Sequence, residues 1–144
     1  MAEVRRAESP FPNATERIPA ILVVEDEVLI RLVIADYLRE CGFKVYEAGT
    51  AAEAIEVIES ETAAIDLVFS DVRLPGQMNG FGLAHWARVN RPDLLVMLTS
   101  GDANRSEAAK QLCENEPFFA KPYDVELVVA RIRAMVDARA PKGD

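Results

Sequence analysis

The sequence has little histidine and cysteine, and it is short of basic residues. A single histidine and two cysteines, which stand 72 residues apart without a C-x-x-C motif, exclude a disulfide scaffold and a zinc or other His/Cys metal cluster. Lys and Arg total 16 against 24 Asp and Glu, a net charge of −8, which argues against binding to nucleic acid or to an anionic membrane. The chain also lacks any apolar run near the ~20 residues of a membrane span, and it lacks the apolar stretch of a signal peptide. We therefore expect a cytoplasmic protein with reduced thiols.

The 144 residues contain enough apolar material for one domain, because 50% of them are hydrophobic. Residues 1–19 are turn-rich and carry no net charge, which predicts a flexible N-terminal tail, and residues 139–144 predict a C-terminal tail. Residues 20–138, the predicted domain, hold 20 acidic and 11 basic side chains, a net charge of −9. The folded part is thus expected to be the acidic part.

Short apolar or alternating runs in the domain take turns with helical patterns. The expected strands cover residues 20–24, 43–47, 65–70, 94–98 and 118–120. The expected helices cover residues 28–40, 51–59, 81–90, 104–113 and 123–138, and residues 74–80 are expected to form a loop. Gly42 should end the first helix in a left-handed conformation, and Thr50 with Glu53 should form a capping box. This alternation predicts an α/β fold with a parallel five-stranded sheet and helices on both faces.

Polar side chains follow the predicted strands at their carboxyl ends: Glu25-Asp26, Asp71, Thr99 and Lys121. Open parallel sheets place ligand sites at this edge, so the groups should converge on one crevice. Each residue alone has an ordinary explanation; Asp26, for example, could simply cap the first helix. Their occurrence at one edge of one sheet is what points to a site.

The chemistry of this set favours a hard metal ion and a phosphoryl group. Three carboxylates close together repel one another unless a cation lies between them, and oxygen ligands without His or Cys favour Mg²⁺. One carboxylate could then attack phosphorus to form an aspartyl phosphate, with Lys121 as a neutralising cation and the Thr99 hydroxyl as a hydrogen-bond donor.

The set resembles the bacterial response-regulator receiver domain, related to chemotaxis regulators, over residues 20–138. The segments "ILVVEDE", "DLVFSDVRLPGQMNGFGLA", "VMLTSG" and "FFAKPYD" stand in the family's order. The separations are also similar: 45 residues from Asp26 to Asp71, 28 from there to Thr99 and 22 from there to Lys121. The resemblance implies a doubly wound, flavodoxin-like (βα)5 fold with strand order 2-1-3-4-5.

The resemblance also implies roles for residues at the phosphorylation site. Asp71 would be the phosphoacceptor and a ligand of Mg²⁺, for which Mn²⁺ can substitute. Asp26 would bind the metal directly and Glu25 through a water molecule. The main-chain carbonyl of Arg73 would complete the protein ligands.

Two further roles concern the phosphoryl group and the response to it. Thr99 and Lys121 would hold the phosphoryl group, and Thr99 with the aromatic Phe118 would form a switch. Movement of the Thr99 hydroxyl would let the Phe118 ring swing inward, which would alter the face formed by the helix at 104–113, the strand at 118–120 and the last helix.

These roles imply a signalling switch rather than a metabolic enzyme. A histidine kinase or histidine phosphotransfer protein would donate phosphate, and a protein target would bind the switching face of a monomer or weak dimer. Because few residues follow Ala138, we expect a stand-alone regulator. Three alternatives remain: a receiver from a hybrid kinase or larger regulator, a pseudo-receiver that binds partners without phosphate, and a haloacid-dehalogenase-type phosphatase. The phosphatase is disfavoured because it needs an Asp where Arg73 stands.

Overall fold

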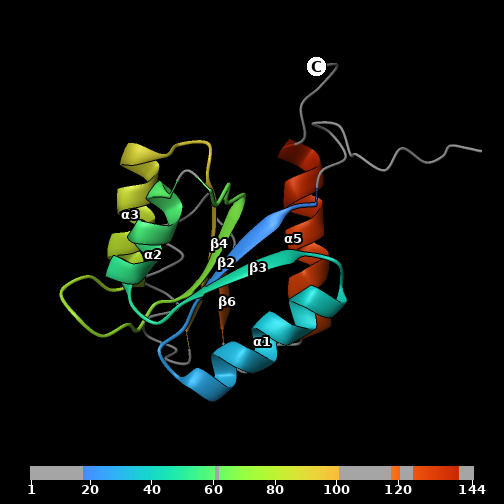
Figure 1. Ribbon diagram of the computed structural model, residues 1–144, viewed down its shortest axis with the longest axis horizontal. Helices are drawn as coiled ribbons and strands as arrows, with labels where there is room; N and C mark the ends of the chain where they lie inside the picture. The colour runs from blue at the N-terminus through green and yellow to red at the C-terminus, as the bar shows by residue number, and fades with distance from the viewer. Residues whose placement is uncertain (1–17, 61, 101–117, 121–124, 140–144) are drawn as a thin grey trace, which may run out of the picture.

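The structure is a computed structural model that describes residues 18–60, 62–100, 118–120 and 125–139. With the labels of Figure 1, its strands are β2 (Ala20–Val24), β3 (Lys44–Ala48), β4 (Leu67–Asp71), β5 (Leu95–Ser100) and β6 (Phe118–Ala120). Its helices are α1 (Val28–Glu40), α2 (Ala51–Glu59), α3 (Gly80–Asn90) and α5 (Val125–Arg139). The predicted helix at 104–113 lies outside the described residues, as does nearly all of both predicted tails, so the domain boundaries stay predictions.

The strands form one parallel sheet in the spatial order β3-β2-β4-β5-β6. In chain order this is 2-1-3-4-5, so the predicted topology is confirmed. The strand expected at 65–70 begins two residues later. Asp66 precedes the ladder, and its carboxylate accepts a hydrogen bond from the Ala20 N–H at 2.8 Å. The backbone of Asp66 is nevertheless already paired with both neighbouring strands. Its N–H donates to the Ala20 carbonyl at 2.8 Å, and its carbonyl accepts from the Leu95 N–H at 3.2 Å.

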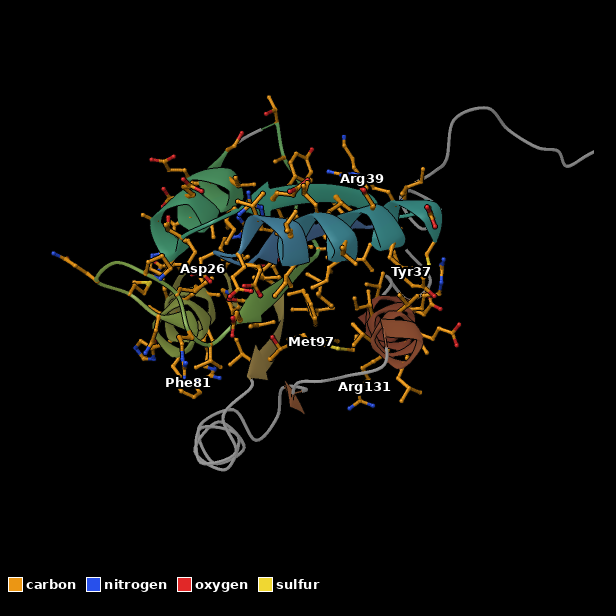
Figure 2. All side chains as sticks on the ribbon, turned by 90° about the horizontal axis from the view of Figure 1, so that it is seen from below. Asp26, Tyr37, Arg39, Phe81, Met97 and Arg131 are labelled. Carbon is orange, nitrogen blue, oxygen red and sulfur yellow. The ribbon has the colours of Figure 1, made fainter. Side chains whose placement is uncertain are left out.

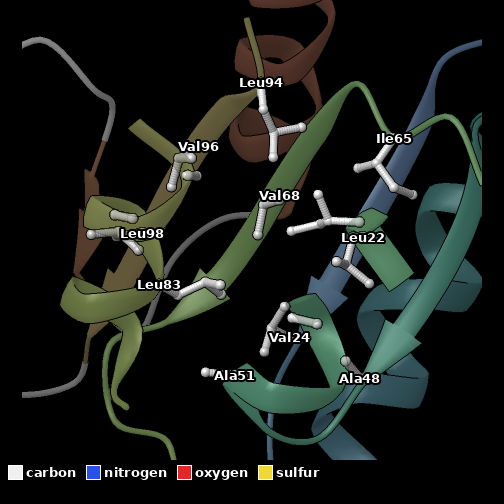
Figure 3. Packing of buried hydrophobic residues seen from close by; sticks show 14 of the residues in the cluster. Leu22, Val24, Ala48, Ala51, Ile65, Val68, Leu83, Leu94, Val96 and Leu98 are labelled. Carbon is white, nitrogen blue, oxygen red and sulfur yellow. The ribbon is translucent and has the colours of Figure 1, made fainter. Parts of the chain in front are cut away.

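Helices cover both faces of the sheet and enclose two separate hydrophobic cores (Figure 1). Leu22 and Val24 of β2 point into the core beneath α2 and α3 (Figure 3). Ile21 and Val23, the alternate residues, point into the core beneath α1 and α5. This alternation explains why β2 is apolar along its whole length: both faces of the strand are buried.

The local signals at helix ends are confirmed with one difference. Gly42 has a φ of 101°, the left-handed conformation expected after α1. The Thr50 side chain accepts a hydrogen bond from the Glu53 N–H at 3.0 Å, as a capping box requires. However, Glu53 accepts from the N–H of Gly49, at 2.8 Å, rather than from the N–H of Thr50.

Helix α1 also exposes an unusual number of large apolar side chains. The five that stand in its first two turns have 37 to 77% of their surface exposed: Val28, Leu29, Ile30, Leu32 and Val33. Among the described residues, no helix is both long and apolar enough to span a membrane.

Candidate phosphorylation site

Three strands bring the candidate residues to one edge of the sheet. Glu25 and Asp26 follow the last residue of β2, Asp71 is the last residue of β4, and Thr99 pairs with Asp71 in the register of β5. Carboxylate oxygens of Glu25, Asp26 and Asp71 all lie within 4.8 Å of one another. The predicted convergence is therefore present for these three carboxylates, with Thr99 beside them.

Glu25 and Asp26 have different environments although they are adjacent. The Glu25 N–H continues the pairing with β3 through a 3.0 Å bond to the Ala48 carbonyl, and its side chain is buried, with 3% exposed. One Glu25 carboxylate oxygen accepts from the Glu27 N–H at 3.2 Å. Asp26 is exposed, and the N-cap of α1 is Glu27, which makes no side-chain capping bond. The alternative that Asp26 serves as the helix cap is wrong, and its carboxylate belongs to the acidic cluster instead.

Hydrogen bonds hold Asp71 and the chain just after it. The Arg73 N–H donates to the Asp71 carboxylate at 3.2 Å, and the Ser70 hydroxyl donates to the Asp71 carbonyl at 2.8 Å. The Val72 N–H donates to the Thr99 carbonyl at 2.8 Å, so the pairing of β4 with β5 continues past the acid. These contacts give Asp71 a defined position at the rim of the sheet.

Gly80, at the end of the loop that follows Asp71, packs closely against the backbone of Asp71 and Val72. Its N–H donates to the Val72 carbonyl at 2.7 Å, and a Cβ at this position would lie 2.4 Å from the Asp71 carbonyl oxygen. The sequence placed Gly80 in the loop, whereas the structure makes it the first residue of α3. No side chain fits between this helix and the backbone of the candidate phosphoacceptor.

The other predicted site residues are described to different extents. Thr99 is buried, with 1% of its surface exposed, and it lies directly beside Asp71. Arg73 is exposed, and its backbone adjoins the Asp71 carboxylate through its N–H. Phe118 pairs with Leu98 through the backbone of β6, but its side chain lies outside what the structure describes. Lys121 falls wholly outside the described residues.

The donor set fits a hard divalent cation. Three carboxylates that converge within 4.8 Å are strongly repulsive without a cation between them, and oxygen atoms are the ligands Mg²⁺ prefers. Asp26 is exposed and Asp71 is half-buried, so hydrated ions can reach them from solvent. A partly open site of this kind suits Mg²⁺, which retains several water ligands.

Comparison with known families identifies the family to which the domain belongs. The family model for the response regulator receiver domain matches residues 21–133. The chain therefore belongs to the response regulator receiver domains, as its motifs indicated. Domains of this family are signalling switches that interact with kinases and target proteins, and they generally bind Mg²⁺ at an acidic pocket.

Curated relatives show the same domain in proteins of different lengths. The chain is 30% identical over 123 residues to the "Probable chemotaxis protein CheY" of Rhizobium etli, covering 82% of this chain and 92% of that protein. It is 30% identical over 118 residues to "Sensor kinase CckA" of Brucella abortus, covering 81% of this chain but 12% of the kinase. It is 32% identical over 117 residues to "Probable transcriptional regulatory protein TcrX" of Mycobacterium tuberculosis, covering 81% of this chain and 49% of the regulator.

Solved structures agree with the fold. A receiver domain protein from Methanospirillum hungatei superposes with a TM-score of 0.77 at 26% identity, over 85% of this chain and 97% of that chain. A response regulator receiver protein from Sinorhizobium medicae gives a TM-score of 0.76 at 29% identity, with the same coverage of 85% and 97%.

Proposed function

We propose that this chain is the phosphoacceptor of a two-component system or phosphorelay, and that Asp71 receives the phosphoryl group from a phosphohistidine. The observation that carries the proposal is the convergence of the Glu25, Asp26 and Asp71 carboxylates within 4.8 Å, beside the buried Thr99. In an ordinary solvated acidic surface, there would be no reason for carboxylates from the ends of β2 and β4 to meet beside Thr99 of β5.

In the transfer, a carboxylate oxygen of Asp71 attacks phosphorus. The new O–P bond forms as the P–N bond to the histidine breaks, and the bonding electron pair leaves with the imidazole, which takes up a proton. The Arg73 N–H orients the Asp71 carboxylate for this attack through its 3.2 Å bond. A bound Mg²⁺ would neutralise charge on the phosphoryl oxygens. Asp26, Asp71 and the Arg73 carbonyl would hold the ion directly, and Glu25 would reach it through water.

Thr99 and Lys121 would then hold the transferred phosphoryl group. The Thr99 hydroxyl is buried beside Asp71, so its movement toward phosphate would leave a space within the sheet edge. We assign Phe118 as the side chain that fills this space. The target protein would read the resulting change on the face that includes β6 and α5.

A protein, rather than a small molecule, is the phosphodonor that the surface favours. The exposed apolar side chains of α1 begin two residues after Asp26, with Val28 and Leu29 54% and 77% exposed. A donor domain that presents its histidine to Asp71 would cover this part of α1. Both a stand-alone regulator and a receiver within a hybrid protein have relatives, because the match spans 92% of the Rhizobium chemotaxis protein and 12% of the Brucella kinase.

Small-molecule phosphorylation tests the proposal without knowledge of the donor. The purified chain is incubated with phosphoramidate or acetyl phosphate, with Mg²⁺ or with EDTA, and its intact mass is measured. We expect an acid-stable, base-labile adduct of one phosphoryl group that needs Mg²⁺ and is absent in Asp71→Asn. Asp93→Asn, an exposed acid on the loop before β5, is the matched control and should be phosphorylated as wild type. Wild type without adduct at any Mg²⁺ concentration would favour the pseudo-receiver instead.

A further inference from the structure

Arg31, in the first turns of α1, bonds to the main chain of Glu25, one of the three residues of the acidic cluster. Its Nη1 donates to the main-chain carbonyl of Glu25 at 2.8 Å, and its Nε donates to a carboxylate oxygen of Glu47 at 3.2 Å. The Arg31 side chain is 19% exposed, and Nη1 would lie 3.3 Å from a Cβ at Gly49. The guanidinium is thus enclosed by α1, the end of β2 and the segment after β3.

The hydrogen bond to Glu25 acts on Asp26 through the peptide plane. The Glu25 carbonyl, the Asp26 N–H and the Asp26 Cα belong to one rigid planar unit. The N–H of Glu25 is already fixed by its 3.0 Å bond to the Ala48 carbonyl. When Arg31 fixes the carbonyl of Glu25 as well, both sides of that residue are held, and the Asp26 Cα has a defined position.

Arg31 is itself held in place by Glu47, which a second arginine also contacts. The Glu47 carboxylate that accepts from Arg31 Nε also accepts from Arg39 Nη2 at 3.1 Å, on its other oxygen. Glu47 therefore lies between two arginines of α1 that stand eight residues apart, or about 12 Å along the helix. Arg39 also pairs with Asp36 at 3.3 Å, so two carboxylates face the two guanidinium groups. Arg31 therefore contributes position more than it contributes positive charge to the metal site.

We propose that Arg31 is a positioning residue of the phosphorylation site, which sets where the Glu25 and Asp26 carboxylates meet Asp71. The inference rests on the proposed function. The helical pattern of the sequence does not distinguish Arg31, because it does not show that this cation turns toward the end of β2.

The test compares Arg31→Met with Arg39→Met. Arg39 is a matched control because it contacts the same Glu47 and also donates to a main-chain carbonyl, that of Val45 at 3.1 Å. It differs in lying toward the end of α1 remote from Asp26 (Figure 2). Mg²⁺ binding is measured by titration calorimetry, and amide hydrogen exchange of residues 25–27 is measured in EDTA.

Removal of a residue that supports metal ligands typically weakens metal binding at least about tenfold. We therefore expect Arg31→Met to raise the Mg²⁺ Kd about tenfold, and Arg39→Met to change it less than about twofold. Exchange of the Asp26 amide should be faster in Arg31→Met alone. The rate of phosphorylation by phosphoramidate should return to near wild type in this variant at saturating Mg²⁺, because the reacting Asp71 is unchanged. Arg31→Lys, which can reach only one of the two acceptors, should be intermediate, and it carries the test if Arg31→Met fails to fold.

Two results would overturn the inference while the proposed function stands: unchanged Mg²⁺ affinity and Asp26 exchange in Arg31→Met, or equal losses of Mg²⁺ affinity in both arginine variants. The second result would show that the Arg31–Glu47–Arg39 network only stabilises the fold. If wild type itself binds no Mg²⁺, the proposed function fails, and this inference fails with it.

Discussion

Gly80 offers the sharpest test of how α3 supports Asp71, the proposed phosphoacceptor. In Gly80→Ala, the added Cβ would lie 2.4 Å from the Asp71 carbonyl oxygen and 2.6 Å from the Val72 Cα. Comfortable contacts of a carbon atom with oxygen or carbon begin at about 3.3–3.5 Å. Because both obstructing atoms are backbone, either α3 or the end of β4 must move by about 1 Å.

The expected loss of stability is the penalty for overpacking minus the gain in helix propensity from glycine to alanine. Forcing an additional methyl group into a packed site costs about 1–3 kcal/mol, and a backbone obstruction on two sides lies at the upper end of that range. Alanine recovers at most about 1 kcal/mol relative to glycine in a helix. We expect Gly80→Ala to lower the free energy of unfolding by about 2 kcal/mol, or the Tm by about 8 °C.

Gly82→Ala is the matched control, two residues further along the same helix. Its added Cβ would lie 2.7 Å from the Met78 Cγ, a side-chain atom that can rotate away. Helix propensity then offsets the contact, so the stability should stay within about 1 kcal/mol of wild type. The free energy of unfolding of both variants is measured by urea denaturation, monitored through the fluorescence of Trp86 in α3. The phosphoramidate reaction reports on Asp71. Equal stability of Gly80→Ala and wild type, or equal losses in the two variants, would refute the reasoning.

Substitutions at three further positions test other parts of the fold. Leu22→Ala removes a fully buried side chain of β2 and should lower the free energy of unfolding by about 3–5 kcal/mol in urea denaturation; a loss below 1 kcal/mol would contradict the described core. Asn79→Ala removes the 2.9 Å bond from the Gly82 N–H and should cost about 1 kcal/mol, measured as a fall in Tm; an unchanged Tm would mean the cap is dispensable. Gly76→Ala should lose about 1 kcal/mol in the same measurement, because its φ is 95° with open space around it, whereas Gly76→Asn should lose less.

The sequence predicted the sheet well because the signals for strands and for helices are both local. The continuous apolar run of β2 reports burial on two faces, and the helical spacing after it locates α1 at its observed residues. The convergence of Glu25, Asp26 and Asp71 followed from the rule that parallel strands end at the same edge, and the cluster confirms it. The roles of Thr99, Lys121, Arg73 and Phe118 stay predictions from the resemblance.

What the sequence could not predict depends on contacts between distant segments. The hydrogen bonds of Asp66 to Ala20, which stands 46 residues earlier, join the beginnings of β4 and β2. The requirement for glycine at position 80 arises from the close approach of α3 to the Asp71 backbone, which no local pattern records. Since arginine is common on exposed helix faces, Arg31 also gave no sign that it bonds to the end of β2.

The division of the interior into two cores, one on each side of the sheet, has a consequence for how such a chain can diverge. Among the residues that the structure describes, Leu22 and Leu83 belong to the cluster on one side of the sheet, and Ile21 and Ile132 belong to a separate cluster on the other side. A change of volume on one face must be compensated on that same face, while the other face keeps its packing. Core substitutions in the two helical layers can therefore accumulate independently of each other. Both layers pack on the same strands, whose ends carry the acidic cluster.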